Sequence, residues 1–445
     1  MKNTNYETVV GMEIHVELST ATKMFCRCPF PTLQDQPNTL TCPICLGLPG
    51  ALPFPNKQAI ESCIQIGLAL NCKINKDSFF ERKNYFYPDL SKGFQISQYL
   101  HPFGEKGYLD IKINGVEKRI GITRVHMEED TGKLTHATVK GREVSLIDFN
   151  RSSVPLVEIV TEPDIRSGEE AKLFLTELQK IIRYLGVSDA DMEKGHMRLE
   201  PNISLRPPGQ TTLPKYKVEV KNINSFKFVD KAIQYEEKRH EELLDKGETP
   251  IQETRGWNEF KNKTVSQRSK EEAHDYRYFP EPDIPPIKIT QDQISEIENK
   301  IPELPAEKIK RFAIDYGITE YNAEILTRDL KLAHFFEEAI SVGIAYNIVP
   351  LTIANYIINK KPNIEELLPA TLVKKIKEES TVLQIDNNVL ESAIRTVMEK
   401  NPQAVADYKS GKVQIIGFLI GQTRQVLPNA KDTEQIRKKL TEMLE

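Results

Sequence analysis

VVGMEIHVEL, residues 9–18, alternates apolar and polar side chains in the way typical of a β-strand with one buried face. Successive side chains of a strand point to opposite faces, so Glu13, His15 and Glu17 share one face and the apolar residues share the other. The pattern therefore predicts that the apolar face contacts a core, while the polar face carries carboxylates around an imidazole. When this stretch is taken alone, an ordinary half-buried strand with a solvated side is the better explanation.

The same pattern recurs in four further predicted strands, at Ile120–Glu128, Leu156–Glu162, His196–Leu205 and Lys215–Lys221. Each strand sets polar and charged residues on one face against apolar residues on the other. The polar members are Arg124, His126, Glu128, Glu158, Glu162, His196, Arg198, Glu200, Asn202, Ser204, Lys217, Glu219 and Lys221.

These faces are rich in Glu with His, Arg and Lys between them. Carboxylates held together repel one another unless a cation neutralises them. Oxygen ligands with one imidazole and nearby cations indicate a site for Mg²⁺ and the phosphates of a nucleotide. The chain has no G-x-x-x-x-G-K-[ST] loop, so a bound ATP would lie on the sheet. A sheet with an ordinary solvated face remains the alternative.

Composition sets the broad class. The 445 residues include 60 basic and 64 acidic ones, for a net charge of -4, which argues against nucleic-acid binding by bulk electrostatics. The opening MKNTNYETVV lacks the apolar run of a signal peptide, and no uncharged stretch is long enough to cross a membrane. We therefore expect a cytoplasmic protein with reduced cysteines.

Four of the six cysteines form two close pairs. Cys26 and Cys28 are spaced C-x-C, and Cys42 and Cys45 are spaced C-x-x-C. Two such pairs across a short loop predict a tetrahedral structural zinc site, with cysteines packed as small apolar groups as the alternative. The remaining two, Cys63 and Cys72, are expected in the core.

Helical spacing of apolar residues predicts helices over Lys57–Leu70, Gly168–Leu185 and Phe226–Leu244. The proline-rich segment Asp275–Pro286 marks a boundary, and the chain beyond it has helical patterning with almost no strand signal. From Asp407 to the end the net charge is +2, which suits either RNA docking or a solvated helical face.

Many long stretches of the sequence resemble those of one protein family. They are GMEIHVEL, CPICLGLPGALP, RKNYFYPDL, KGFQISQ, ITRVHMEED, VPLVEIVTEPDIRS, VKNINSF, ETRGW, DYRYFPEPD and NPQAVADYKSGK with GFLIGQ. Together, and in this order, they resemble the B-subunit family of the glutamine-dependent aspartyl/glutamyl-tRNA amidotransferases. The resemblance covers nearly the whole chain.

The resemblance implies a ligase of protein biosynthesis. Such an enzyme uses ATP to convert the side-chain carboxylate of Glu or Asp, misacylated on the tRNA for Gln or Asn, into an acyl phosphate that ammonia then attacks. The ammonia comes through a channel from a separate amidase, the A-subunit, and the small C-subunit clasps the two in a heterotrimer. The archaeal Glu-specific relative carries a large inserted domain for which this chain has no room.

The resemblance also implies an α+β fold. Residues 1–288 would form a mostly antiparallel-sheet cradle of glutamine synthetase-like type that holds ATP, Mg²⁺ and zinc. All-α helical and tail domains would follow at residues 289–371 and 372–445, with the tail binding tRNA.

Site residues carry over position by position. Glu13, His15 and Glu128 match the family's Mg²⁺ ligands, and the four paired cysteines match its zinc ligands. Glu158 and Glu219 join the catalytic acidic cluster. We assign nucleotide binding to Arg198, Glu200, Asn202, Ser204, Lys217 and Lys221.

Three positions depart from the family pattern. Ser91 stands where Pro is usual, Ser153 where Gly is usual and Glu200 where Asp is usual. The last change lengthens an expected ligand.

Two other classes of function compete with this reading. A zinc-containing tRNA-binding adaptor without its own chemistry would bind tRNA without ATP and tolerate Glu13→Ala. A free-standing ammonia ligase acting on a small amino acid would have no use for the long helical tail.

Overall fold

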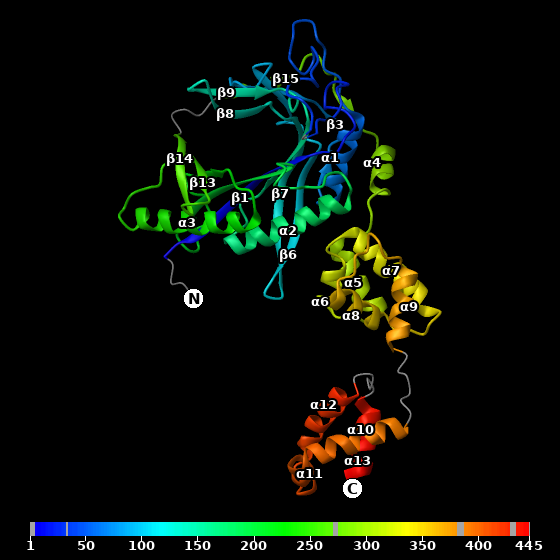
Figure 1. Cartoon of the computed structure of the whole chain (residues 1–445). Coiled ribbons are helices and arrows are strands. Elements are labelled where there is room, and N and C mark those ends of the chain that lie inside the picture. The colour runs from blue at the N-terminus through cyan, green and yellow to red at the C-terminus, as the bar shows by residue number, and fades with distance from the viewer. Residues whose placement is uncertain (1–4, 33, 270–274, 381–386, 428–432, 445) are drawn as a thin grey trace. The chain divides into compact units, whose positions relative to one another are not determined.

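The computed structural model describes residues 5–32, 34–269, 275–380, 387–427 and 433–444. The chain divides into two compact units near Arg311, and residues 327–330 belong with the first. The first unit is built on a large sheet and the second on helices alone (Figure 1).

A nine-stranded mixed sheet organises the first unit. Its order is β14 (Lys263–Ser269), β13 (Glu253–Asn258), β12 (Val218–Lys221), β11 (Met197–Arg206), β1 (Glu7–Glu17), β10 (Pro155–Thr161), β7 (Val116–Glu129), β6 (Gly104–Ile113) and β2 (Lys73–Ile74). Neighbouring strands are antiparallel except β12 and β13. The expected α+β class is thus confirmed, while the glutamine synthetase-like type stays a prediction.

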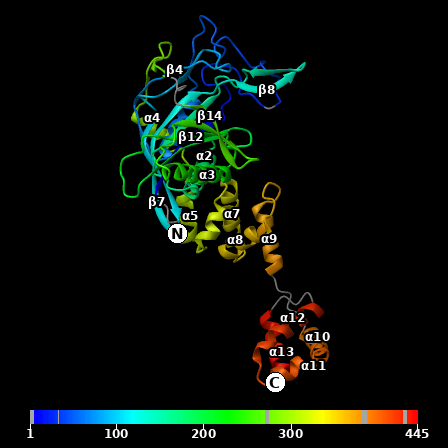
Figure 2. The ribbon, with the colours of Figure 1, turned by 90° about the vertical axis from the view of Figure 1, so that its left-hand side faces the viewer.

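The apolar face of the sheet is covered by helices. On β1, Val10, Ile14 and Val16 are completely buried, as the alternating pattern predicts. Helix α1 (Lys57–Ala69) contacts β6 and β7, α2 (Gly168–Tyr184) contacts β6, and α3 (Phe226–Leu244) contacts β11. Figure 2 shows α2 and α3 side by side against the strands. The polar face is left free for the site.

The predicted helices agree with the observed ones to within a residue at each end. Both α2 and α3 begin after a serine, Ser167 and Ser225, whose side chain accepts a hydrogen bond from the backbone three residues on. Such caps satisfy backbone N–H groups that have no partner inside the helix.

One strand is shorter than expected. The stretch predicted from Lys215 to Lys221 pairs with β11 only from Val218 onward. The backbone N–H of Leu205, which faces Tyr216 in this register, donates instead to the Tyr216 hydroxyl at 3.1 Å. The Tyr216 hydroxyl thus accepts the N–H that would otherwise extend the pairing of β11 with β12.

Smaller sheets surround the main one. Strands β15 (Phe279–Pro280), β4 (Glu81–Asn84) and β5 (Phe94–Ser97) form one, and β16 (Ile287–Lys288) pairs with β3 (Asp77–Ser78). A hairpin joins β8 (Lys133–Val139) and β9 (Arg142–Asp148). The pairing of β15 with β4 brings residues near 279 beside residues near 82, which matters for the site.

Among the described residues after β16, the regular elements are helices: α4 (Gln291–Glu298), α5 (Pro305–Tyr316), α6 (Glu320–Leu326), α7 (Leu330–Ile344), α8 (Pro350–Lys360), α9 (Pro369–Ser380), α10 (Asn387–Lys400), α11 (Pro402–Lys409), the short 3₁₀ helix η2 (Val413–Ile415), α12 (Ile416–Val426) and α13 (Thr433–Leu444). Ile294 and Ile297 of α4 lie in the core of the sheet unit. Helices α10, α12 and α13 enclose a separate small core.

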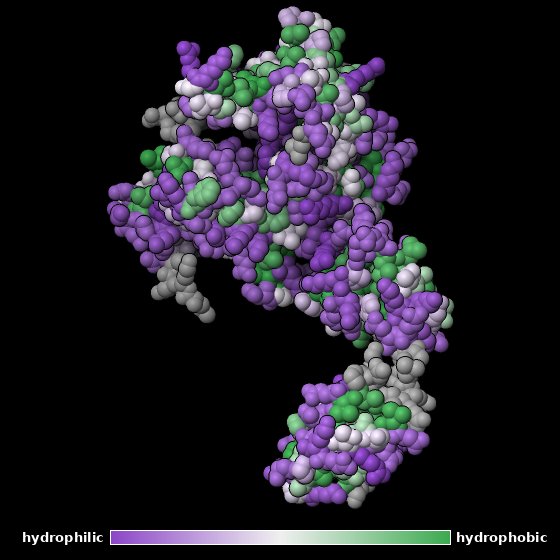
Figure 3. All heavy atoms as spheres, viewed as in Figure 1, coloured by the Kyte–Doolittle hydropathy of each residue, from purple (hydrophilic) through white to green (hydrophobic). Residues whose placement is uncertain are grey.

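The predicted domain boundaries at residues 288 and 371 stay predictions. Lys431, Asp432 and Glu445, which enter the charge count of the tail, lie outside the described residues. Within the described ranges, no helix combines the length and apolar character that spanning a bilayer requires. Hydrophilic side chains dominate the face seen in Figure 3.

Candidate active site

Four strands bring one row of side chains together on the polar face of the sheet. Arg198 on β11 lies opposite His15 on β1, His15 lies opposite Glu158 on β10, and Glu158 lies opposite His126 on β7. Residues directly opposite in neighbouring strands have their side chains on the same face within contact distance. The strand register therefore builds the first half of the site.

His15, Glu128 and Glu158 form one group of possible metal ligands. His15 Nε2 lies 3.3 Å from Glu128 Oε1 and 3.7 Å from Glu158 Oε2. Burial by itself would lower the pKa of His15, but the hydrogen bonds and charges of the two carboxylates raise it to about 10. His126 Nε2 contacts Glu158 from the other side at 3.2 Å. The buried carboxylates are thus held by imidazoles.

Glu13, Glu200 and Glu219 form a second group, with one oxygen of each within 4.8 Å of the others. Burial raises the pKa of Glu13, and the charges of Glu158, Glu200 and Glu219 add to this. Lys221 Nζ lies 3.0 Å from Glu200 and 3.5 Å from Glu219, which offsets part of the repulsion.

A cavity of about 580 Å³ joins the two groups. Its walls include side chains to which the sequence analysis gave no role: Lys83, Tyr85, Tyr99, Tyr276 and Tyr278. Lys83 Nζ lies 5.1 Å from the Tyr276 ring centre, and the Tyr99 and Tyr278 rings stack at 4.8 Å.

Pairing of β4 with β15 explains how these aromatic residues reach the site. The blocks RKNYFYPDL and DYRYFPEPD are both part of the family resemblance, so the sequence did mark these aromatic residues as members of a family motif. Nothing local in either block indicates that the two meet across nearly 200 residues.

Lys83 supplies positive charge to the cavity. Burial alone would lower the pKa of its amine, but the charge of Glu128, with smaller contributions from Tyr278 and Glu158, raises that pKa above its ordinary value. An amine held protonated in this way suits a site that receives anionic phosphate or carboxylate groups.

Most of the predicted site residues line this cavity. They are Glu13, His15, Glu128, Glu158, Arg198, Glu200, Glu219 and Lys221. The Arg198 guanidinium donates to Asp130 at 2.8 Å, so this pair faces the cavity together. Asn202, Ser204 and Lys217 instead line a smaller adjacent cavity. Glu17 is buried against Asp130, and burial and that neighbour raise its pKa to about 8.

The predicted Mg²⁺ ligands are distributed over the two groups. Glu13 lies with Glu200 and Glu219, whereas His15 and Glu128 lie with Glu158. Glu13 and His15 are two residues apart on one strand, about 7 Å along its axis, so each meets a different row of neighbours.

The donor chemistry of both groups fits a divalent cation. Mg²⁺ prefers carboxylate oxygens, and Glu13, Glu200 and Glu219 provide three carboxylates whose charges repel without a cation. The group around His15 adds one imidazole nitrogen to two further carboxylates. These residues could hold a metal beside the phosphates of a nucleotide.

The two cysteine pairs meet as the spacing predicts. The four sulfur atoms, of Cys26, Cys28, Cys42 and Cys45, all lie within 4.8 Å of one another. A hydrogen bond from Cys26 lowers the pKa of Cys45 to about 5, with a smaller effect from the nearby charge of Lys23. Cys63 and Cys72 are buried apart from this cluster, as expected.

Two serines anchor the cysteine loop. The hydroxyls of Ser91 and Ser152 donate to the Cys45 carbonyl at 2.8 and 3.0 Å. Ser153 is different: it is fully buried with φ at 69°, and its hydroxyl has no hydrogen-bond partner among the described residues. A left-handed backbone conformation favours glycine, which fits the glycine that the resembling family usually has here.

Comparison with known proteins identifies the family. Residues 8–295 match the family model described as the GatB/GatE catalytic domain, and residues 334–444 match the GatB domain. A protein from Dehalococcoides mccartyi, named as the B-subunit of an aspartyl/glutamyl-tRNA(Asn/Gln) amidotransferase, is 46% identical, over 94% of this chain and 95% of its own length. A protein of the same name from Thermosipho melanesiensis is 45% identical, over 98% of this chain and 99% of its own length.

Proposed function

The chain belongs to the GatB family of tRNA amidotransferase subunits, and from this premise we propose that it carries the ATP-dependent step that converts misacylated tRNA to its amide form. The substrate is Glu-tRNA(Gln), Asp-tRNA(Asn) or both. ATP phosphorylates the side-chain carboxylate, and ammonia then displaces phosphate to form the amide. The observation that carries the proposal is the meeting of two acidic groups with cations in one cavity.

The chemistry explains why such a cavity is needed. A carboxylate is a poor electrophile, and its acyl phosphate is lost to water unless water is excluded. Tyr85, Tyr99, Tyr276 and Tyr278 line the cavity, and their rings would keep water from part of it. Positive charge from Lys83 and Lys221 favours the anionic phosphates in it.

Mg²⁺ is the proposed cofactor. Glu13, His15 and Glu128, with Glu158, Glu200 and Glu219 beside them, would hold it. When bound, the ion would offset charge on the phosphate oxygens of ATP. Arg198, Asn202, Ser204, Lys217 and Lys221 would contact the nucleotide around it.

We also propose that the four cysteines hold a structural zinc ion. One C-x-C pair and one C-x-x-C pair bring four thiol groups together, which fits a closed tetrahedral site. The site lies apart from the acidic groups, so it would order the loop between Thr20 and Pro53 and take no part in the reaction.

In keeping with the family, we assign ammonia supply to a separate amidase chain, with a small third chain that completes a heterotrimer. The helical region that follows the sheet unit would hold the tRNA, and the assembly would work in the cytoplasm.

The test is reconstitution. The chain is purified with candidate amidase and small subunits, then supplied with Glu-tRNA(Gln), glutamine and ATP labelled on the γ-phosphate. We expect phosphate release and Gln-tRNA in equal amounts, both dependent on all components. Binding of tRNA without phosphate release would contradict the proposal and favour the adaptor alternative.

A further inference from the structure

Lys23 carries its ammonium group into the protein interior beside the cysteine cluster. The side chain is completely buried, which is rare for lysine because a charge taken out of water needs compensation. Its Nζ donates to the carbonyls of Leu40 and Phe149 at 2.8 and 3.4 Å and contacts Cys45 Sγ at 3.7 Å. No carboxylate among the described residues forms an ion pair with it. Of its contacts, only the Cys45 sulfur can therefore carry an offsetting negative charge.

The same lysine also holds the other cysteine pair. Its backbone N–H donates to the Cys28 carbonyl at 3.0 Å, so one residue contacts both the C-x-C turn and the C-x-x-C turn. The Cys45 sulfur further accepts the backbone N–H of Cys42 at 3.1 Å. Two N–H donors, one of them charged, thus converge on the sulfur of Cys45.

The spacing of the sulfurs suits a loaded metal site. Zinc–sulfur bonds of about 2.3 Å in a tetrahedron place two sulfurs about 3.8 Å apart. Cys42 Sγ and Cys45 Sγ lie 3.8 Å apart. Four thiolates around one divalent ion leave two negative charges in excess. Inside a protein, such an excess is costly unless a cation lies beside it.

These contacts assign Lys23 a role that the cysteine spacing does not reveal. We propose that Lys23 is the charge partner of the zinc site, where its ammonium offsets one excess negative charge and donates an N–H to the Cys45 thiolate. This inference rests on the zinc ion proposed above. Groups behind the ligands commonly set metal affinity. Because binding effects are reciprocal, zinc also makes the buried ammonium tolerable.

Zinc affinity of the full chain, measured by competition with a chelator, tests the charge. Lys23→Gln keeps N–H donors without the charge, and Lys23→Met keeps the length of the stem without either. We expect each substitution to raise the Kd for Zn²⁺ by about tenfold or more. The matched control is Lys57→Met, at a side chain on α1 that is 88% exposed, which should leave the Kd unchanged.

Cobalt separates an effect of charge from an effect on the loops. Co²⁺ can replace Zn²⁺ at four thiolates, and it then absorbs light by charge transfer from sulfur to metal. A cation beside a sulfur lowers the energy of its lone pairs, so loss of the Lys23 charge should shift this band to longer wavelength. Ser152→Ala removes a hydrogen bond from the Cys45 carbonyl but no charge, so it should lower the melting temperature and leave the band in place.

A measurement on the unaltered chain applies even if neither Lys23 variant folds. Acetic anhydride labels accessible amines, and mass spectrometry reports the labelling of each lysine. We expect Lys23 to resist labelling while zinc is bound and to react once a chelator has removed the metal. Lys57 should react in both states, because its side chain is exposed. Labelling of Lys23 at the same rate with and without zinc would overturn the inference.

Two results from the variants would overturn it as well. One is an unchanged zinc affinity in a folded Lys23→Gln or Lys23→Met chain. The other is a weaker affinity with an unchanged cobalt band, because Lys23 would then only tie the loops together. An unaltered chain that binds no zinc would instead defeat the proposed zinc site, and this inference with it. The proposed reaction is tested separately, by phosphate release.

Discussion

His15 on β1 lies directly opposite Glu158 on β10, and its Nε2 is 3.7 Å from a Glu158 oxygen that His126 also contacts at 3.2 Å. One buried carboxylate is thus shared by two imidazoles from different strands. Burial opposes ionisation of Glu158, but the charge and hydrogen bond of His126, followed by those of His15, hold its pKa well below the ordinary value. The charge of Glu158 therefore orders this part of the cavity.

Removing that charge tests the role of Glu158. Glu158→Gln keeps the side-chain shape, so the strand should still form, but the imidazoles lose their anionic partner. We expect amide formation on misacylated tRNA to slow by about 100-fold or more. The matched control is Glu162→Gln, just beyond the same strand, where the side chain is exposed and bonded to Thr123. Equal rates in the two variants would contradict the assignment.

Metal content tests the cysteine cluster. We expect one zinc ion per purified chain by atomic emission, and its loss in Cys45→Ser, because structural zinc needs all four thiolates. The melting temperature should fall with it. Cys63→Ala, in the core and outside the cluster, should keep the metal. A chain that lacks zinc yet melts at the same temperature with or without Cys45 would show that the thiols only pack.

Two adjacent serines should respond in opposite directions. Ser153→Gly relieves the left-handed backbone and removes a buried hydroxyl without a partner among the described residues, so it should stabilise the sheet unit by about 1 kcal/mol. Ser152→Ala loses the hydrogen bond to Cys45 and should destabilise it by about 1 kcal/mol.

The measurement is urea unfolding followed by fluorescence of Trp257, the single tryptophan, which lies in β13 of this unit. A fall in stability of Ser153→Gly would mean that the serine backbone is not strained.

Glu236 should make stability depend on acid pH. Burial alone would raise its pKa, but hydrogen bonds from His240, Arg239 and Thr264 lower the pKa to about 2. A lowered pKa means that the stabilisation is present above the ordinary value of 4.5 and is lost as the pH falls from there towards 2. This stabilisation of the folded state is about 3 kcal/mol.

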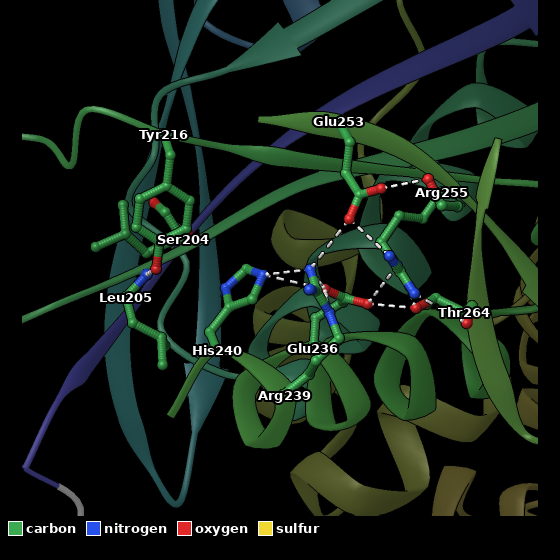
Figure 4. Close-up of polar contacts among 11 residues, drawn as sticks. Ser204, Leu205, Tyr216, Glu236, Arg239, His240, Glu253, Arg255 and Thr264 are labelled. Carbon is green, nitrogen blue, oxygen red and sulfur yellow. Dashed lines mark hydrogen bonds and ion pairs between the residues drawn. The ribbon is translucent and has the colours of Figure 1, made fainter. Parts of the chain in front are cut away.

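We expect Glu236→Gln to lower the free energy of unfolding by about 3 kcal/mol at neutral pH, since the half-buried Arg239 and Arg255 lose their anionic partner (Figure 4). Unfolding of the variant, followed by Trp257 fluorescence, should also change less between pH 5 and pH 3. Glu242→Gln, at an exposed position on the same helix, should behave like the unaltered chain. An identical pH dependence in both variants would contradict the role of Glu236.

Local pattern was sufficient for much of this protein. Alternation along Val9–Leu18 predicted both the strand and its polar face, and the cysteine spacing predicted the cluster, because each depends on residues only a few positions apart. The long ordered blocks identified the family, which the comparisons confirmed.

Tertiary structure decided which of these groups meet. Strand register, set by pairing between distant segments, placed Glu13 with Glu200 and Glu219 but His15 with Glu128 and Glu158. It also brought Tyr276 over Lys83 and set Tyr216 against His240 beside a second cavity. A sequence states which face of its own strand a residue occupies, whereas contact across a sheet depends on where every other strand comes to lie.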